Sequence, residues 1–269
     1  MRALAGFPSE ARRRIRFVLL DIDDTLTTEG RLSADAYAAL ERLSQHGLRV
    51  IPVTGRPAGW CDMIARFWPV DAVIGENGAF YFRYDHAART MTRRFWLSDE
   101  EREATGRRLA RLGEEIVAAL PRTRIAADQP FRVADLAIDF AEDTGPLPPA
   151  EVDRIVAMMQ AAGASAKVSS IHVNGWFGDY DKLTTSRLMM RKLFGIDLDA
   201  ARSRYVFAGD SPNDAPMFGF FPNAVGVANV RDFAADMDHP PRWITAARSG
   251  AGFVELASAL VAARVKDER

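Results

Sequence analysis

The chain has 269 residues, of which 48% are hydrophobic and 26% are charged. This length and balance predict a globular protein with one large domain or two modest ones. The formal net charge is −1, so no overall field draws the chain toward nucleic acid or a membrane surface. A single cysteine, Cys61, excludes an internal disulfide framework and favours a reducing cytoplasm. No apolar run approaches the ~18 residues that a membrane span needs.

A basic cluster, formed by Arg12, Arg13, Arg14 and Arg16, precedes the first apolar run. Such a cluster is also typical of a nucleic-acid patch or of an export signal. The apolar run behind it ends at Asp21, which makes it too short for the core of a signal. We therefore expect a solvated lead-in to the first strand, and neither nucleic acid nor a membrane among the partners.

The apolar run Phe17–Leu20 is followed at once by Asp21, Asp23 and Asp24. Four apolar residues are too few for a helix and suit a strand that is buried on both faces. The acids then stand at the carboxyl end of this strand, where open α/β sheets bind ligands. Acids so close together repel one another, and folding tolerates this only if a cation or a hydrogen-bonded network compensates them. A divalent cation is the simpler answer, and oxygen ligands without His or Cys favour Mg²⁺. Alternatively, Asp24 and Thr25 merely cap a following helix.

Strand and helix patterns alternate from this first strand onward. Ser33 is a typical N-cap of the next helix and Gly47 closes it. Alternation of this kind predicts a doubly wound parallel sheet with right-handed crossovers. The expected elements are strands at 17–20, 48–53 and 72–74, with helices at 33–47 and around 60–67.

The pattern changes at Glu76-Asn77-Gly78-Ala79 and resumes at Asp181. The region between them is rich in strand patterns and contains two helical ones. We therefore expect an α/β fold with a Rossmann-like core formed by residues 1–82 and 179–269, and an inserted α/β cap domain over 83–178. From residue 79 to the end of the insert we expect strands at 79–84, 90–96, 122–127, 134–140 and 166–173, and helices at 98–120 and 150–162. After the insert we expect helices at 182–194, 214–218 and 252–263, and strands at 204–208, 224–227 and 243–245.

Four polar clusters fall at loops of the expected core. They are Asp21–Thr25, Thr54–Arg56, Asp181–Lys182 and Gly209–Asp214. Three of them follow strands directly, so parallel strands bring them to one edge of the sheet. Taken singly, each cluster is also an ordinary turn, helix cap or solvated lysine. Taken together and in this order, they favour a site for phosphoryl transfer.

The residue types of these clusters suit that chemistry. Asp21 can attack phosphorus as a carboxylate nucleophile. Asp210 and Asp214 add acids that could complete a Mg²⁺ site with it. Thr54 and Lys182 offer a hydroxyl donor and a fixed cation to the phosphoryl oxygens, whose charge must be neutralised before an anion can approach.

The chain resembles the haloacid dehalogenase (HAD) superfamily, whose four motifs look like D-I-D-D-T-L-T, V-T-G-R, D-K and G-D-S-P-N-D here. The insert between the second and third motifs, with E-N-G-A at its entrance, is similar to subclass IIB, which carries a large α/β cap there. That subclass includes Cof-type, sucrose-phosphate and mannosyl-phosphoglycerate phosphatases and phosphomannomutases. Asp24 departs from the pattern, because the family often has Gly at this position. Asp is a known variant there and leaves the other assignments standing.

The resemblance implies a cytoplasmic, Mg²⁺-dependent phosphatase that forms an aspartyl phosphate and acts on a small phosphorylated metabolite. Asp21 is then the nucleophile, and Asp23 is the general acid for the leaving alkoxide and afterwards the base that activates water. Carried over from the motifs, phosphate is held or oriented by Thr54, Gly55, Lys182 and Asn213, and Mg²⁺ by Asp21, the backbone carbonyl of Asp23, Asp210 and Asp214.

The cap is expected to select the leaving group, since the core site recognises only phosphate and metal. Candidate contacts are Asn174, Trp176, Arg132 and His172. Asn174 and Trp176 are preferred because they lie in the segment that returns to the third motif. A Trp ring stacked on a sugar, with an Asn amide on its hydroxyls, is ordinary carbohydrate recognition, so a sugar phosphate is expected. Alternatively, Trp176 packs the hinge.

Two other functions stay open at this stage. A phosphomutase would use the same nucleophile and acid but would retain and reorient its bisphosphate intermediate. A non-enzymatic regulator on this scaffold should have lost a required side chain. The sequence retains all of them, namely Asp21, Asp23, Thr54, Lys182 and Asp210.

Overall fold

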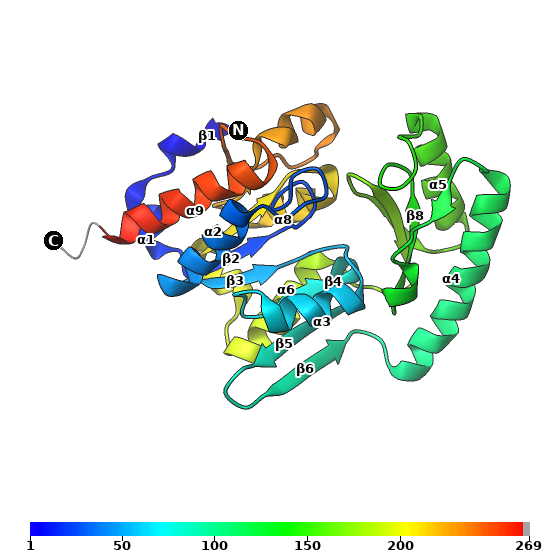
Figure 1. The fold of residues 1–269 in the computed structure, drawn as a ribbon, viewed down its shortest axis with the longest axis horizontal. Coiled ribbons are helices and arrows are strands. Elements are labelled where there is room, and N and C mark those ends of the chain that lie inside the picture. The colour runs from blue at the N-terminus through cyan, green and yellow to red at the C-terminus, as the bar shows by residue number, and fades with distance from the viewer. Residues whose placement is uncertain (266–269) are drawn as a thin grey trace.

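The computed structural model describes residues 1–265, and a parallel sheet lies at its centre (Figure 1). This sheet has six strands in the order β1-β13-β12-β11-β2-β3, and all neighbours run parallel. The expected doubly wound core is therefore confirmed. The strands are β1 (Arg2–Ala3), β2 (Phe17–Leu20), β3 (Arg49–Pro52), β11 (Tyr205–Gly209), β12 (Val225–Gly226) and β13 (Trp243–Ile244).

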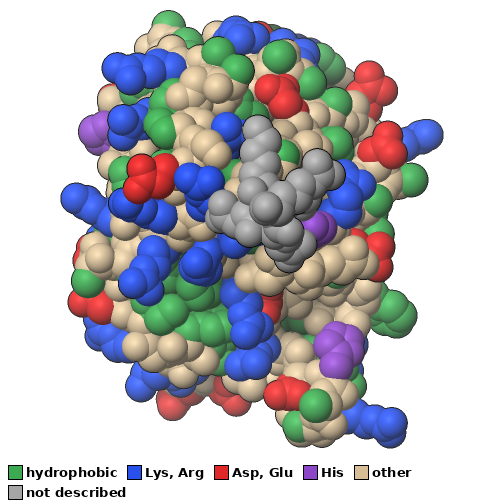
Figure 2. Space-filling view, turned by 90° about the vertical axis from the view of Figure 1, so that its left-hand side faces the viewer, with side chains coloured by type: hydrophobic (Ala, Val, Ile, Leu, Met, Phe, Trp, Pro, Cys, Tyr) green, Lys and Arg blue, Asp and Glu red, His purple; other side chains and the backbone are tan. Residues whose placement is uncertain are grey.

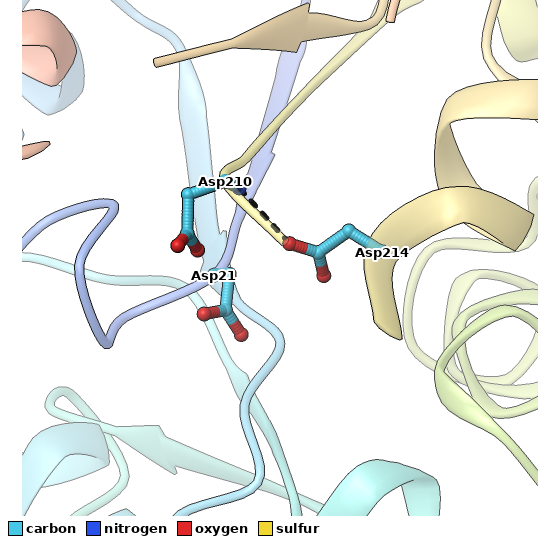
Figure 3. A group of neighbouring side chains, drawn as sticks. All are labelled: Asp21, Asp210 and Asp214. Carbon is cyan, nitrogen blue, oxygen red and sulfur yellow. Dashed lines mark hydrogen bonds between the residues drawn. The ribbon is translucent and has the colours of Figure 1, made fainter. Parts of the chain in front are cut away.

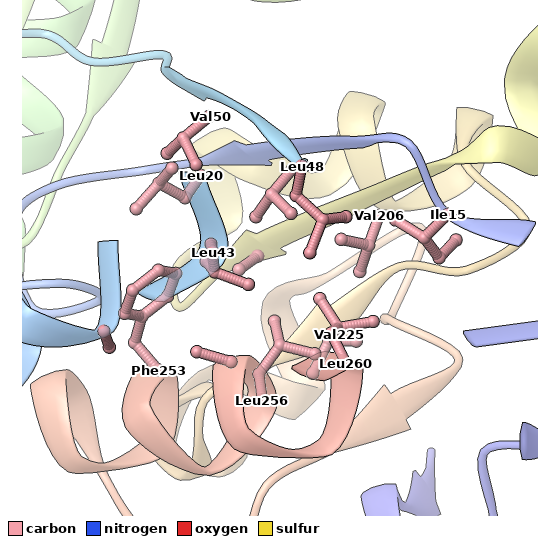
Figure 4. Close-up of a cluster of buried hydrophobic side chains, with 14 of the residues drawn as sticks. Ile15, Leu20, Leu43, Leu48, Val50, Val206, Val225, Phe253, Leu256 and Leu260 are labelled. Carbon is pink, nitrogen blue, oxygen red and sulfur yellow. The ribbon is translucent and has the colours of Figure 1, made fainter. Parts of the chain in front are cut away.

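The middle strand β2 is buried on both faces, as its unbroken apolar run predicts. Val18 and Leu20 pack into a cluster beneath the helices α2 and α9 (Figure 4), whereas Phe17 and Leu19 pack on the opposite face. Each such side chain stabilises the fold by about 1.5–3 kcal/mol through burial. The helices around the sheet are α1 (Ser9–Arg14), α2 (Ala34–Gln45), α3 (Ala58–Phe67), α6 (Lys182–Phe194), α7 (Leu198–Ala201), α8 (Ala215–Phe220) and α9 (Ser249–Val265), with 3-10 turns η1 (Leu4–Gly6), η4 (Arg202–Arg204), η5 (Pro212–Asp214) and η6 (Ala228–Asp236). Within residues 1–265, no helix is long and apolar enough to cross a bilayer.

Three arginines of the basic cluster near the N-terminus lie in helix α1, directly before the first strand of the expected core. A guanidinium nitrogen of Arg12 donates to the carbonyl of Ala259 at 3.1 Å, and Arg264 donates to the carbonyl of Ile15. These bonds tie α1 to α9. Figure 2 looks onto this end of the molecule, away from the site described below, and shows Lys and Arg side chains gathered there.

The hairpin after β4 extends the core rather than the insert. Strand β5 (Phe80–Asp85) pairs with both β4 (Val73–Gly75) and β6 (Thr90–Phe95), and β4 meets the end of β3 through a parallel bridge between Val53 and Ile74. The expected boundary at residue 83 therefore falls inside β5. The physical reason is packing, because Phe80 and Phe82 are buried in one cluster with residues of α3.

The inserted unit follows this hairpin and is built on a separate antiparallel sheet. Its strands lie in the order β7-β8-β10-β9, and two helices cover one face. We call residues 98–176 the cap layer. Its elements are β7 (Arg124–Ile125), β8 (Asp135–Asp139), β9 (Ser165–Val168), β10 (His172–Trp176), α4 (Asp99–Ala119), α5 (Pro149–Ala161) and the 3-10 turn η3 (Gln129–Phe131).

Two expected strands of the cap layer differ from the structure. The pattern over 122–127 forms only the two-residue strand β7. The pattern over 166–173 forms two strands, β9 and the start of β10, because the chain turns back between them. In this turn the Ser169 amide donates to the carbonyl of His172 at 2.8 Å.

The two faces of the cap-layer sheet differ in chemistry because side chains alternate along a strand. Leu136, Ile138 and Val173 pack beneath α4 and α5. Asp135 and Asn174 belong to the other face, and Asn174 donates to Asp135 at 3.0 Å. This polar face is turned toward the carboxyl ends of the parallel strands.

One buried carboxylate joins the cap layer to the core. Glu76 begins the turn η2 (Glu76–Gly78), with a φ of 43° in the left-handed region. Its carboxylate accepts the backbone N–H groups of Val133 (3.0 Å), Ala134 (2.6 Å) and Asp135 (3.1 Å) in the cap layer, and of Ala58 (2.9 Å) in the core. The buried backbone N–H groups at this junction thus have the Glu76 carboxylate as their hydrogen-bond acceptor.

We expect Glu76→Ala to destabilise the protein by about 3–5 kcal/mol, because it leaves buried N–H groups without a partner. Urea unfolding followed by circular dichroism measures the change. Glu103→Ala is the matched control, since Glu103 pairs with Arg107 on the surface, where ion pairs contribute little. Equal effects of the two substitutions would contradict the role given to Glu76.

Candidate active site

Three carboxylates converge at the carboxyl edge of the parallel sheet. Asp21 follows β2 and Asp210 follows its neighbour β11, while Asp214 belongs to the turn η5. All three are at most 5% exposed, and one ligand oxygen from each lies within 4.8 Å of the others. Figure 3 shows the three side chains pointing toward one another. Residues distant in the sequence thus meet as the strand order requires.

Lys182 is the cation of this cluster. Its Nζ donates to Oδ1 of Asp21 at 2.7 Å and to Oδ1 of Asp214 at 2.8 Å. The side chain of Asp181 caps α6 by accepting from the Thr184 amide at 2.6 Å. This cap places Lys182 in the first helical turn, where it is buried against the carboxylates.

One ammonium does not neutralise three buried carboxylates. Burial raises the pKa of Asp21 to about 7; Lys182 lowers it, whereas Asp214 and Asp23 add to the rise. Burial, Asp214 and Asp21 raise the pKa of Asp210 well above its usual range. A divalent cation among these oxygens would relieve the repulsion, and an all-oxygen donor set suits a hard ion. The buried acidic triad therefore fits a metal ion.

The Thr54–Arg56 turn lies directly beside the carboxylates. Oγ1 of Thr54 accepts the Arg56 amide at 3.0 Å, and Thr54 is fully buried. A Cβ atom on Gly55 would lie 3.3 Å from the Asn77 amide and 3.7 Å from that of Asn174. Glycine at this position therefore leaves room for the Asn77 side chain, whereas the distance to Asn174 is an ordinary van der Waals contact.

The loop after β11 brings Asn213 to the same place. Oδ1 of Asn213 accepts from the Ser211 hydroxyl at 2.9 Å. Asn213 lines a small pocket together with Asp21 and Asn174. The core residues expected at the site are thus brought together in the structure.

Asp23 lies apart from the acidic triad and faces a different cation. Nε of Arg56 is 3.0 Å from both carboxylate oxygens of Asp23, and Nη2 is 2.8 Å from Oδ1. The neighbouring Asp24 has a φ of 54°, in the left-handed region that favours glycine and tolerates Asp. Its carbonyl accepts from Asn229 at 2.6 Å. This conformation is one that Asp adopts at little cost and that Gly would also allow.

The four cap-layer candidates take different positions. Asn174 faces the pocket beside Asp21, and Arg132 donates to the carbonyl of Gly55 at 2.9 Å. His172 has its Nε2 2.9 Å from a carboxylate oxygen of Glu142.

Trp176 is 3% exposed and donates through Nε1 to the carbonyl of Tyr180 at 3.2 Å. Its ring stacks on Tyr180 with centroids 6.0 Å apart, within a hydrophobic cluster that includes Ile22 and Phe80. These contacts favour the hinge-packing alternative for Trp176.

Little room separates the cap layer from the triad. The pocket between Asp21 and Asn174 measures about 10 Å³, roughly the space of one water molecule. A larger cleft of about 380 Å³ adjoins it, lined on one side by Asp23 and Arg56 and on the other by Glu142 and Ser170. The cap layer therefore lies close to the core at Asp21, whereas the cleft beside Asp23 remains wide.

Sequence reasoning gave no role to five charged residues that shape the site. Asp135 had a usable signal, because D-L-A-I-D alternates polar and apolar residues as a strand with one polar face does. The others occur in turns without such a pattern. The five are Arg56, Glu76, Asp128, Asp135 and Glu142.

Comparison with solved structures shows which class has this fold. Protein 0175 of Thermoplasma acidophilum is 20% identical, with a TM-score of 0.68 over 91% of this chain and 98% of that one. The sucrose-phosphatase from Synechocystis, solved with sucrose and phosphate, is 14% identical, with a TM-score of 0.62 over 92% and 98%. A HAD subclass IIB sugar phosphatase is 16% identical, with a TM-score of 0.57 over 91% and 96%. No curated protein matches the chain.

The fold is the one seen in solved HAD-like hydrolases with an α/β cap. Residues 18–100 match the family model described as haloacid dehalogenase-like hydrolase. The resemblance expected from the four motifs is therefore confirmed, and with it the expectation of an enzyme.

We expect Trp176→Ala to lower the free energy of unfolding by about 3–5 kcal/mol, because it removes a buried aromatic side chain. Trp176→Phe should cost less, since it keeps a ring against Tyr180 and loses only the indole hydrogen bond. Thermal and urea unfolding of both variants measure the difference. A stable Trp176→Ala variant with changed substrate preference would instead assign the residue to recognition.

Proposed function

We propose that the chain is a Mg²⁺-dependent phosphatase that hydrolyses a small phosphate monoester through an aspartyl-phosphate intermediate. The buried triad of Asp21, Asp210 and Asp214, with Lys182 as its cation, carries this proposal. Mg²⁺ bound among these oxygens would supply positive charge to the phosphoryl group. The match of residues 18–100 to HAD-like hydrolases supports the same assignment.

The first half of the proposed reaction joins phosphorus to the enzyme. A carboxylate oxygen of Asp21 attacks phosphorus, and the bond from phosphorus to the leaving oxygen breaks. Asp23, in its acid form, gives its proton to that oxygen, so an alcohol leaves. Lys182 and the hydroxyl of Thr54 stabilise the phosphoryl oxygens during this transfer.

The second half restores the enzyme. Asp23, now a carboxylate, takes a proton from water, and the water oxygen attacks phosphorus. The bond from phosphorus to Asp21 breaks, which releases inorganic phosphate and regenerates the Asp21 carboxylate and the Asp23 acid. One ester and one water thus become one alcohol and one phosphate.

A sugar phosphate is the proposed substrate class. The cleft beside Asp23 has a volume of about 380 Å³, and polar side chains from core and cap layer line it. Its volume and polar lining suit a leaving group that carries several hydroxyls. Two structures with this fold are a sucrose-phosphatase and a sugar phosphatase, which supports the same class.

We expect phosphate release from a panel of sugar, nucleotide and cofactor phosphates only when Mg²⁺ is present. Asp21→Asn should lower kcat by about 1,000-fold or more, because an amide is a poor nucleophile. Asp199→Asn is the matched control, since Asp199 pairs with Arg187 at the surface. Full activity of Asp21→Asn, or activity in excess chelator, would refute the proposal. Transfer of labelled phosphoryl to a monophosphate acceptor rather than to water would identify a phosphomutase.

We expect Mg²⁺ to raise the melting temperature of the protein, since ligand at 100-fold above Kd stabilises by about 2.7 kcal/mol. Asp210→Asn should remove most of this gain. Without Mg²⁺ the same variant should be at least as stable as the parent, because a neutral amide relieves the buried repulsion. Differential scanning fluorimetry measures both effects, with Asp199→Asn as control. An unchanged Mg²⁺ response in Asp210→Asn would contradict the metal site.

A further inference from the structure

Arg56 contacts carboxylates from both the core and the cap layer. It binds Asp23 through Nε and Nη2, and the same Nη2 donates to Oε1 of Glu142 at 2.8 Å. Its Nη1 lies 3.5 Å from Oδ2 of Asp128. The guanidinium also lies 4.5 Å from the ring centre of Trp60. The side chain is 4% exposed, so these contacts fix its pose.

The contact geometry distinguishes the two oxygens of Asp23. Oδ1 accepts from both Nε and Nη2 of Arg56, whereas Oδ2 accepts from Nε alone. Oδ2 therefore keeps more free lone-pair capacity and is the better position for a transferable proton. The guanidinium fork orients the carboxyl group about its own bond axis. Arg56 is thus placed to act on Asp23 without touching the substrate's reacting atoms.

Glu142 is held toward Arg56 by its own loop. The carboxylate of Asp139 accepts the backbone N–H groups of Ala141 (3.0 Å), Glu142 (2.8 Å) and Asp143 (2.9 Å). These bonds fix the turn after β8. The His172 ring, whose Nε2 lies 2.9 Å away, and the hydrogen bond from Arg56 lower the pKa of Glu142 to about 2, so Glu142 is charged at neutral pH.

The contact between Arg56 and Glu142 belongs to the closed arrangement. Glu142 lies in the cap layer and Arg56 in the core, 86 residues apart in sequence. The space between Asp21 and Asn174 is only about 10 Å³, so we infer that the cap layer moves when a phosphate ester binds there. Opening must separate the two residues, and closure must restore the contact.

We propose that Arg56 is a positioning residue for Asp23, and that Glu142 holds Arg56 in its productive pose only when the cap layer is closed. Proton transfer from Asp23 to the leaving oxygen is thereby coupled to closure. This inference rests on the proposed phosphatase function. It assigns to Glu142 a role in the departure of the leaving group rather than in its recognition.

The test compares two aryl esters of similar size. Phenyl phosphate has the poorer leaving group and needs a proton more than 4-nitrophenyl phosphate does. In single-turnover experiments with Mg²⁺, Glu142→Ala should slow phenol release by about tenfold and nitrophenol release by less than about twofold, within the range of general acid catalysis. Glu142→Gln, which keeps an acceptor for Arg56, should recover part of the phenol rate.

The Asp23→Asn background shows whether Glu142 acts by positioning Asp23 or only through the shape of the site. If Glu142 acts through Asp23, Glu142→Ala should slow phenol release no further once Asp23 is replaced. Additive losses in the double variant would overturn the proposal. Equal slowing of both esters by Glu142→Ala, or no slowing of either, would overturn it as well.

Glu151→Ala is the matched control. Glu151 is a cap-layer carboxylate that pairs with Arg122 at 3.0 Å, away from the residues that line the site. It should leave both rates unchanged. If the parent protein releases neither alcohol in the presence of Mg²⁺, the phosphatase function itself fails. If the parent is active but Glu142→Ala changes the two release rates equally, only the coupling of proton transfer to cap closure is refuted.

Discussion

The candidate site depends on the buried contact of Lys182 with two carboxylates. Its ammonium lies 2.7 Å from Asp21 and 2.8 Å from Asp214. Attraction is stronger in the interior than at the surface, but so is the cost of removing charges from water. These groups come from the end of β2, the start of α6 and the turn after β11. A different strand order would separate them and leave each charge buried alone.

The negative charge that Lys182 does not neutralise at the triad affects both the stability of the fold and its proposed metal binding. Asp210 accepts from the hydroxyl of Thr25 at 3.1 Å, and the described residues place no basic side chain on it. Burial and the neighbouring carboxylates of Asp214 and Asp21 raise its pKa, because its charge is poorly compensated there. Repulsion among these buried carboxylates destabilises the fold, and relief of the same repulsion would give the cluster affinity for a cation. A well-neutralised cluster would be more stable and would bind metal less well.

The sequence is enough to predict which core residues meet at the site, but it says little about the contacts between the core and the cap layer. Apolar runs locate β2 and β11, and parallel pairing then brings Asp21 and Asp210 together. No local pattern links Arg56 to Glu142, because their contact depends on how the cap layer docks. Alternation likewise identifies β5 as a strand without telling which sheet it joins, and packing on α3 decides that.

The two aspartates of the first motif have different electrostatic surroundings, although one residue separates them. Ile22 between them is buried in a hydrophobic cluster, so its neighbours reach different cations. Asp21 pairs with Lys182, whose other partner also belongs to the core. Asp23 pairs with Arg56, whose other partners belong to the cap layer. The ion pair of Asp21 therefore lies entirely within the core, whereas the cation that binds Asp23 is itself held by the cap layer. This difference fits the proposed roles, in which Asp21 is the nucleophile toward phosphate and Asp23 is the acid for the leaving group.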